Sequence, residues 1–240
     1  FNRQGKLHRQ ISTYFNVVGD GESLEQRADA FLYTGSVDLE LRREKVNNTK
    51  TLYKRGGLRF NGHQGDWRFN ANLFLSSDES SDRQPQNRYY AALESQWLLF
   101  GYGDNYPYFP TLVLNGKRVR GLNSSLRLGK FNVDLTFGKT VRDVEGTLLK
   151  TIPVTNLESE QRADPSAAYG RIDAQTWGKY SYGTYERDLF AVRPSFGSGD
   201  KYQIGFTWLK SKDDMSSIRY GIRPQENLVL GTDMISKFDQ

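Results

Sequence analysis

Apolar and polar residues alternate with a period of two along most of this chain. From position 31 to position 42, the odd positions carry apolar side chains or glycine and the even positions carry mostly polar ones. Successive side chains of a β-strand point to opposite faces, so such a segment has one apolar face and one polar face. Similar rows recur near 11–17, 52–60, 67–75, 89–99, 122–128, 131–137, 202–208 and 228–234. The pattern predicts an all-β fold with long antiparallel strands.

The length of these rows favours a membrane barrel. Strands of soluble proteins average about 5–6 residues, whereas strands that cross a bilayer need about 9–11. Short turns such as Gly129-Lys130 alternate with long polar stretches such as 76–87, and outer-membrane barrels have one short-turn rim and one long-loop rim. Aromatic residues at the row ends suit an interfacial girdle: Tyr33, Trp67, Tyr89, Trp97 and Trp208. We predict an antiparallel up-and-down transmembrane β-barrel, with a soluble sandwich, propeller or solenoid as the alternative.

The turn signals set the expected strand count. Asn115-Gly116 is a strong hairpin dipeptide, and one extra short strand before it gives about twelve strands. Residues 1–240 then form a single barrel domain or barrel segment, with a long loop at about 140–187. The chain ends on Lys237–Gln240 without the terminal aromatic residue typical of bacterial barrels. This departure favours either a section of a larger barrel or a strand count that is off by one at an end.

Composition excludes several classes of protein. The 240 residues have a mean hydropathy of -0.69 and no run of 18 apolar residues, so no transmembrane helix is expected. A barrel needs an apolar residue only at every second strand position, so it tolerates this polarity. Cysteine is absent, which excludes disulfides and thiolate metal sites. The net charge of +5 is spread along the chain, and nucleic-acid binding usually needs a concentrated basic footprint.

Two segments resemble bacterial outer-membrane β-barrel proteins, in particular large envelope barrel proteins. The first runs from Gly103–Pro107 through Leu114–Leu122, and the second covers Phe131–Thr140 and continues as Val141–Gly146. The resemblance covers about a fifth of the chain. It implies a barrel in the outer membrane of a Gram-negative envelope, and it carries over no catalytic residue.

The polar rows supply candidate lumen-lining residues. In a barrel these side chains would point inward, where charge sets the preference for ions or solutes. The alternatives are the solvated face of a soluble sheet, or mutual pairing inside a filled barrel. The candidates are Asp38, Glu40, Arg42, Arg68, Asn70, Asn72, Asp134 and Gln203.

The most unusual local segment is Tyr106-Pro107-Tyr108-Phe109-Pro110. Two prolines cannot belong to a central strand, and three aromatic rings make a rigid, adhesive patch. The segment is either an inward-folded constriction, a docking site for a partner, or a turn anchored at the membrane interface. Nearby basic residues would meet lipopolysaccharide phosphates or face water. The partner or constriction candidates are Tyr106, Tyr108, Phe109, Lys117, Arg118 and Arg120.

No enzyme signature is present. The two histidines, His8 and His63, have no serine-centred nucleophile motif near them, and no glycine-rich phosphate loop occurs. The acidic groups Asp78/Glu79/Asp82 and Asp213/Asp214 lack the spacing of an EF-hand loop, so solvated loops are the simpler reading. We therefore predict no catalytic site, no metal and no cofactor, and an outer-membrane hydrolase ranks last.

Together these features predict an outer-membrane β-barrel that acts as a pore or scaffold for transport or secretion. Its expected partners are membrane lipid, lipopolysaccharide and other envelope proteins, and not nucleic acid. The alternative is a soluble or surface-attached β-rich binding module, such as an adhesin or a carbohydrate binder. That module would use the aromatic residues Trp177, Tyr180 and Tyr182.

Overall fold

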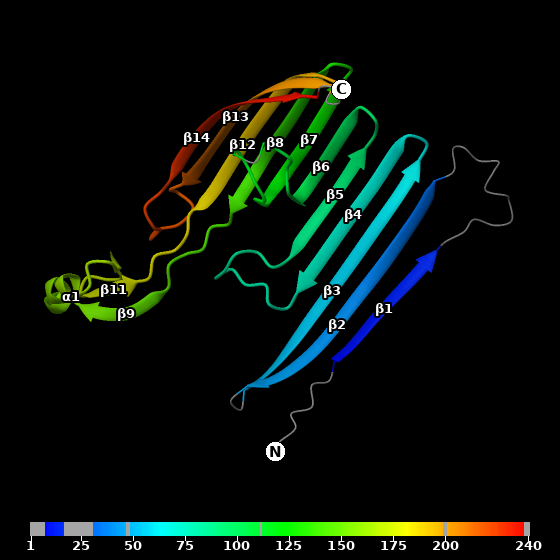
Figure 1. Cartoon of the computed structure of the whole chain (residues 1–240). Coiled ribbons are helices and arrows are strands. Elements are labelled where there is room, and N and C mark those ends of the chain that lie inside the picture. The colour runs from blue at the N-terminus through cyan, green and yellow to red at the C-terminus, as the bar shows by residue number, and fades with distance from the viewer. Residues whose placement is uncertain (1–7, 17–30, 47–48, 111, 199–200, 238–240) are drawn as a thin grey trace.

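The computed structural model of the chain describes residues 8–16, 31–46, 49–110, 112–198 and 201–237. Within these ranges the fold is all-β with one short α-helix, and the strands of both sheets pair antiparallel (Figure 1). The prediction of an all-β antiparallel fold is confirmed. Long strands form because β-branched and aromatic residues recur at alternate positions and few prolines interrupt them.

The large sheet has eleven strands in the order β1-β2-β3-β4-β5-β6-β7-β8-β12-β13-β14. Chain neighbours are therefore sheet neighbours, except that β12 follows β8. The strands are β1 (His8–Asn16), β2 (Leu32–Val46), β3 (Thr49–Gln64), β4 (Trp67–Ser76), β5 (Arg88–Glu94), β6 (Leu98–Asn105), β7 (Val119–Leu128), β8 (Phe131–Val141), β12 (Glu186–Gly197), β13 (Tyr202–Asp214) and β14 (Glu226–Ser236).

A small second sheet occupies the segment predicted as a long loop at 140–187. Its strands β9 (Leu148–Pro153), β10 (Ala168–Arg171) and β11 (Thr176–Tyr180) pair in the order β10-β11-β9. The 3-10 helix η2 (Val154–Asn156) and the helix α1 (Leu157–Ala163) connect β9 to β10. This unit stands away from the large sheet at one side (Figure 1). Its strands of four to six residues are too short to show sustained alternation, so the sequence pattern did not reveal them.

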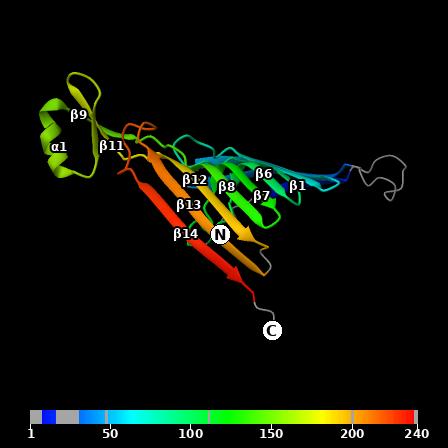
Figure 2. The same cartoon turned by 90° about the horizontal axis from the view of Figure 1, so that it is seen from above.

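The large sheet is one curved layer with two edges. Figure 2 shows that the β14 edge turns out of the plane of β1–β6. In the part of the chain that the structure describes, β1 pairs only with β2 and β14 pairs only with β13, so no closed barrel forms. From β3 onward, tight connections such as that at Gly65 and Gly129 join strands at one end, which we call the hairpin end. The longer connections 77–87, 106–118, 142–185 and 215–225 lie at the other end, the loop end.

The hairpin predicted at Asn115-Gly116 is wrong. Gly116 adopts a left-handed conformation with φ 62°, so a turn does occur there. No strand precedes it, however, because β6 ends at Asn105 and β7 begins at Val119, and the described residues between them form turns and coil. Pro107 and Pro110 have no N–H to donate to a ladder, and Val113 and Leu114 donate their N–H groups to the Pro110 carbonyl instead. The large sheet therefore has eleven strands where about twelve were predicted.

Candidate functional site

On β8, β12 and β13, the two faces of the large sheet are exposed in the opposite sense to a soluble protein. In β8, the polar residues Asn132 and Thr136 are 7% and 0% exposed, whereas Phe137 beside them is 57% exposed. β12 and β13 repeat this pattern: Ser195 and Thr207 are buried, and their apolar neighbours Phe196 and Phe206 are exposed. We call the side that carries these polar residues the inner face and the opposite side the outer face, and the strand register extends both faces across the sheet.

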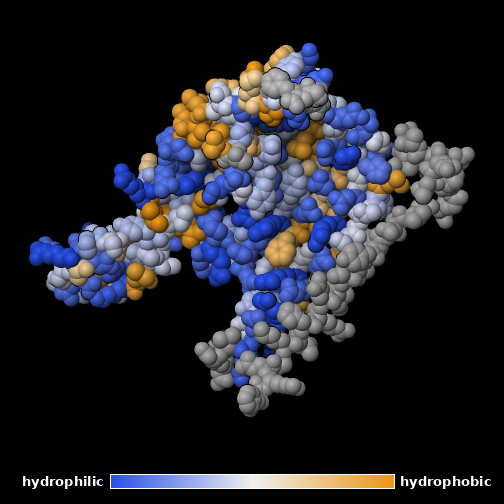
Figure 3. Space-filling view, viewed as in Figure 1, coloured by the Kyte–Doolittle hydropathy of each residue, from blue (hydrophilic) through white to orange (hydrophobic). Residues whose placement is uncertain are grey.

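The strand register places all eight predicted lumen-lining residues on the inner face. Residues paired across a ladder share a face, and an unbroken chain of pairings connects Asp38 on β2 through Asn72 on β4 and Asp134 on β8 to Gln203 on β13. Figure 3 views this face and shows hydrophilic residues over most of its centre. The set is Asp38, Glu40, Arg42, Arg68, Asn70, Asn72, Asp134 and Gln203.

A row of alternating charges crosses the inner face from β7 to β14. Asp134 on β8 accepts hydrogen bonds from Arg127 at 2.6 Å and from Arg193 at 3.2 Å. Arg193 on β12 also donates from Nε and Nη2 to both carboxylate oxygens of Asp233 on β14, at 3.0 and 2.5 Å. Each buried charge therefore has at least one opposite partner, as burial requires.

Gly205 makes this row sterically possible. Arg193 and Asp233 lie on β12 and β14, so their side chains meet over β13, where Gly205 stands. A Cβ atom at position 205 would lie 2.6 Å from Asp233 Oδ1 and 2.7 Å from Arg193 Nη2. The sequence analysis overlooked Arg193, Asp233 and Gly205. The sequence does contain a signal for Arg193, because this charged residue stands among apolar neighbours on β12 at an inner-face position.

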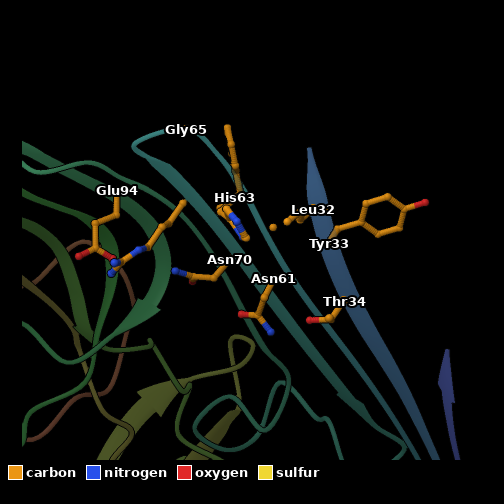
Figure 4. A pocket seen from close by; sticks show the side chains of 11 residues that line it. Leu32, Tyr33, Thr34, Asn61, His63, Gly65, Asn70 and Glu94 are labelled. Carbon is orange, nitrogen blue, oxygen red and sulfur yellow. The ribbon is translucent and has the colours of Figure 1, made fainter. Parts of the chain in front are cut away.

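At the hairpin end, the inner face of β2–β5 forms an open hollow of about 780 Å³. Figure 4 shows the side chains of Asn61, His63 and Asn70 grouped there, with Tyr33 pointing away from them. Glu94 lies beyond them on β5. The hollow has amide, imidazole and carboxylate groups. Among the described residues, however, no three His, Cys, Asp or Glu side chains converge as metal ligands.

The aromatic and proline segment folds onto the inner face. We call residues 106–110 and 112–118 the inner segment. Phe109 and Leu114 are 4% and 8% exposed and pack in one apolar cluster with the inner-face residues of β7, β12 and β13, while Val113 and Val229 of β14 pack against it. The other members of the cluster are Val119, Leu189, Ala191 and Leu209. The segment therefore starts at β6 and reaches over five neighbouring strands to β14 (Figure 1).

The partner or constriction candidates separate into two groups. Tyr106, Tyr108 and Phe109 belong to the inner segment; Tyr108 is 93% exposed and Tyr106 is also exposed. Arg120 lies on the outer side at the loop end, with its guanidinium 5.1 Å from the ring centre of Tyr89. The structure therefore does not bring Arg120 together with Tyr106 and Tyr108. Lys117 is exposed.

Arg118 and Arg120 hold the 77–87 connection in place. Arg120 donates to Asp104 at 2.9 and 2.8 Å and to the Asn87 carbonyl at 2.6 Å. Arg118 lies 3.6 Å from the same carboxylate and donates to the Pro85 carbonyl. These guanidinium groups therefore have protein partners at the outer rim.

Glu79, which lies within the 77–87 connection, adds a further set of charged contacts there. Glu79 accepts hydrogen bonds from the backbone N–H groups of Gln86 and Asn87, both at 2.7 Å, and pairs with Arg142 at 2.6 Å. The hydrogen bond from Asn87 is the main reason that the pKa of Glu79 falls to about 2, and Arg142 lowers the pKa further. The connection therefore keeps its charged contact in mildly acidic conditions.

The aromatic residues considered for a binding module lie on or next to strand β11 of the small sheet. Tyr180 stacks on Tyr220 with ring centres 4.4 Å apart, and Trp177 is half-buried within β11, whereas Tyr182 is exposed.

Among the described residues, no helix has the length and apolar character needed to cross a membrane. No family model matches the chain, and neither the curated proteins nor the solved structures contain a match to it.

Proposed function

We propose that the large sheet is part of the wall of a bacterial outer-membrane β-barrel that acts as a pore or scaffold for transport or secretion. The observation that carries this proposal is the inverted exposure of the two faces on β8, β12 and β13. Many large apolar side chains of the outer face are exposed in the described chain, among them Leu73, Phe137 and Phe206. An apolar face that extends over a whole sheet is unusual for a soluble monomer, whose largest apolar patch typically covers about 300–600 Å². Lipid tails would cover such a face at no cost in hydration.

The length of the outer-face rows supports the same reading. The apolar row of β4 runs from Trp67 to Leu75, eight steps of about 3.4 Å or roughly 27 Å along the strand. The apolar band of an outer-membrane barrel is about 25 Å tall. Aromatic residues stand at both ends of the outer face: Trp67 and Trp97 meet edge to face at the hairpin end, and Tyr89 lies near Tyr102 at the loop end. These pairs suit the two interfacial girdles of a barrel.

The open edges fit a section of a larger barrel. In lipid, each unpaired backbone group costs several kcal/mol. The outer edges of β1 and β14 would therefore need further strands within the membrane. The inner face would then line an aqueous interior that the inner segment narrows, with lipid and lipopolysaccharide as the surrounding partners.

Fractionation and bilayer recording test this proposal together. The protein is expected in the outer-membrane fraction, with faster migration in SDS before heating than after it. Reconstituted protein is expected to conduct ions if the interior is open, and a variant lacking residues 107–117 should conduct more. A water-soluble, detergent-free monomer would contradict the proposal.

A further inference from the structure

A separate cavity of about 430 Å³ lies between the inner segment and the inner face of β5–β8. Its volume falls in the range of about 300–1,000 Å³ that is usual for small-molecule sites. Tyr106 and Tyr108 border it on the side of the inner segment, and Tyr90, Asn123 and Ser125 border it on the side of the sheet. The cavity is distinct from the open hollow at the hairpin end.

Three tyrosine rings give the cavity broad aromatic surfaces. Neither Tyr106 nor Tyr108 makes a ring–ring contact in the described part of the chain, so their faces remain accessible. The ring of Tyr90 lies over Gly101 on β6, where a Cβ atom would be 2.6 Å from the Tyr90 hydroxyl. The glycine leaves room for this ring to lie across the neighbouring strand. Such surfaces suit the apolar C–H face of a ring-shaped ligand, with the hydroxyl groups available for hydrogen bonds.

The charges of the cavity are already neutralised by protein groups. Asp134 of β8 faces the cavity from the inner face, whereas Asp104 of β6 borders it with its side chain on the outer side, beside Arg120. Asp104 lies 2.8 Å from Arg120 and 3.6 Å from Arg118, and Asp134 pairs with Arg127 and Arg193. With two guanidinium groups on each carboxylate, the cavity offers no uncompensated negative charge to a cation. It also has no lysine or arginine among its lining residues to attract an anion.

Neutral hydrogen-bonding groups remain. The side-chain oxygen Oδ1 of Asn123 accepts a hydrogen bond from the Thr136 hydroxyl at 2.8 Å, which leaves the side-chain N–H groups of Asn123 as donors. Ser125 donates to Asp134 at 2.7 Å, so its oxygen can still accept. Asn105 also lines the cavity, and its buried side-chain oxygen has no hydrogen-bond partner among the described atoms. A buried acceptor left unpaired costs about 1–3 kcal/mol.

From these observations we infer that the cavity binds a neutral, polyhydroxylated ligand of the carbohydrate class, such as a short oligosaccharide. The tyrosine rings stack on the sugar, and Asn123 and Ser125 hydrogen-bond its hydroxyl groups. This inference rests on the proposed function, since it identifies the class of solute that the inner face would meet.

Binding is tested on the full-length protein in lauryldimethylamine oxide, because this detergent has no sugar headgroup to compete. Maltotriose, cellotriose and triacetylchitotriose are the neutral probes, spermine and trigalacturonate are the charged ones, and calorimetry measures the affinity. At least one neutral probe should bind more tightly than both charged probes. Tyr108→Ala and Tyr106→Ala should each weaken that binding roughly three- to tenfold.

The matched control is Tyr182→Ala, another exposed tyrosine that lies outside the cavity. This variant should bind like the unaltered protein. Absence of binding by every neutral probe, tighter binding of spermine or trigalacturonate, or unchanged affinity in Tyr108→Ala would each overturn the inference. Since the assay needs neither a bilayer nor an open pore, sugar binding without membrane insertion would contradict only the proposed function. Ion conduction without sugar binding would contradict only this inference.

Discussion

The outer and inner faces of the large sheet differ in a way that the strand pattern alone does not distinguish. A soluble sheet buries its apolar row and exposes its polar one. Here Phe131 and Phe137 are exposed while Asp134 between them is 7% exposed. The same period-two alternation therefore fits two opposite arrangements. In one the apolar row is buried and the polar row is exposed, and in the other the polar row is buried and the apolar row is exposed. Only the pairing and burial of the polar row tells them apart.

The inner face itself has two halves. On β2 and β3, Asp38 and Arg59 form an ion pair whose arginine side chain is 68% exposed. On β8–β14, Arg193 and Asp134 are nearly enclosed, and the inner segment packs beside them. The first half is an open polar wall, and the second is a packed wall that anchors a folded segment. Four predictions test these contrasts.

The largest effect is expected from Phe109→Ala. Truncation of a buried phenylalanine typically costs about 3–5 kcal/mol, and here the loss falls on the attachment of the inner segment to the sheet. Limited proteolysis within residues 106–118 should become markedly faster. The neighbouring substitution Tyr108→Ala removes an exposed ring and should leave cleavage unchanged. Equal cleavage of both variants would show that the segment is not anchored through this side chain.

The contrast between the faces predicts the next effect. Leu73→Arg places a charge on the outer face, which costs about 2–4 kcal/mol near the middle of a bilayer. Asn72→Arg places the same charge on the inner face one residue earlier, where water would solvate it. Folding into lipid vesicles, followed by the heat-modifiable shift in SDS, should fail or weaken only for Leu73→Arg. Similar folding of the two variants would argue against lipid contact.

Gly205→Ala should separate Arg193 from Asp233. The added methyl group overlaps both side chains, and overpacking of this kind typically costs about 1–3 kcal/mol. Gly56→Ala is the control, because its Cβ would meet Leu39 at an ordinary 3.7 Å. The unfolding midpoint in urea should fall for Gly205→Ala and change little for Gly56→Ala.

The smallest effect concerns pH and the 77–87 connection. The pKa of Glu79 is lowered to about 2, so its stabilising contribution is fully present above the ordinary value near 4.5 and is lost as the pH falls through about 2. The amide NMR signals of Gln86 and Asn87 should titrate with a midpoint near 2. In Glu79→Gln this transition should disappear. A midpoint near 4.5 in the unaltered protein would mean that the contact is absent in solution.

The sequence predicted the strands and the residues that share a face because a period-two pattern assigns both at once. Asp38, Asn72 and Asp134 fall on one face for this reason. It did not predict the partners of Arg193, since pairing across β13 depends on the register and on the space above Gly205. The Asn115-Gly116 turn gave a misleading hairpin because the burial of Val113 and Leu114 outweighed the local turn preference.

The most direct test of lipid contact uses the natural absence of cysteine. Single cysteines introduced in turn from Arg68 to Leu75 on β4 would carry spin labels in the reconstituted protein, and collision with oxygen or with a polar nickel chelate would be measured. We expect period-two alternation, with labels at Phe69, Ala71 and Leu73 favouring oxygen and labels at Arg68, Asn70 and Asn72 favouring the chelate. Uniform access along β4, or alternation with the opposite phase, would contradict a lipid-facing outer face.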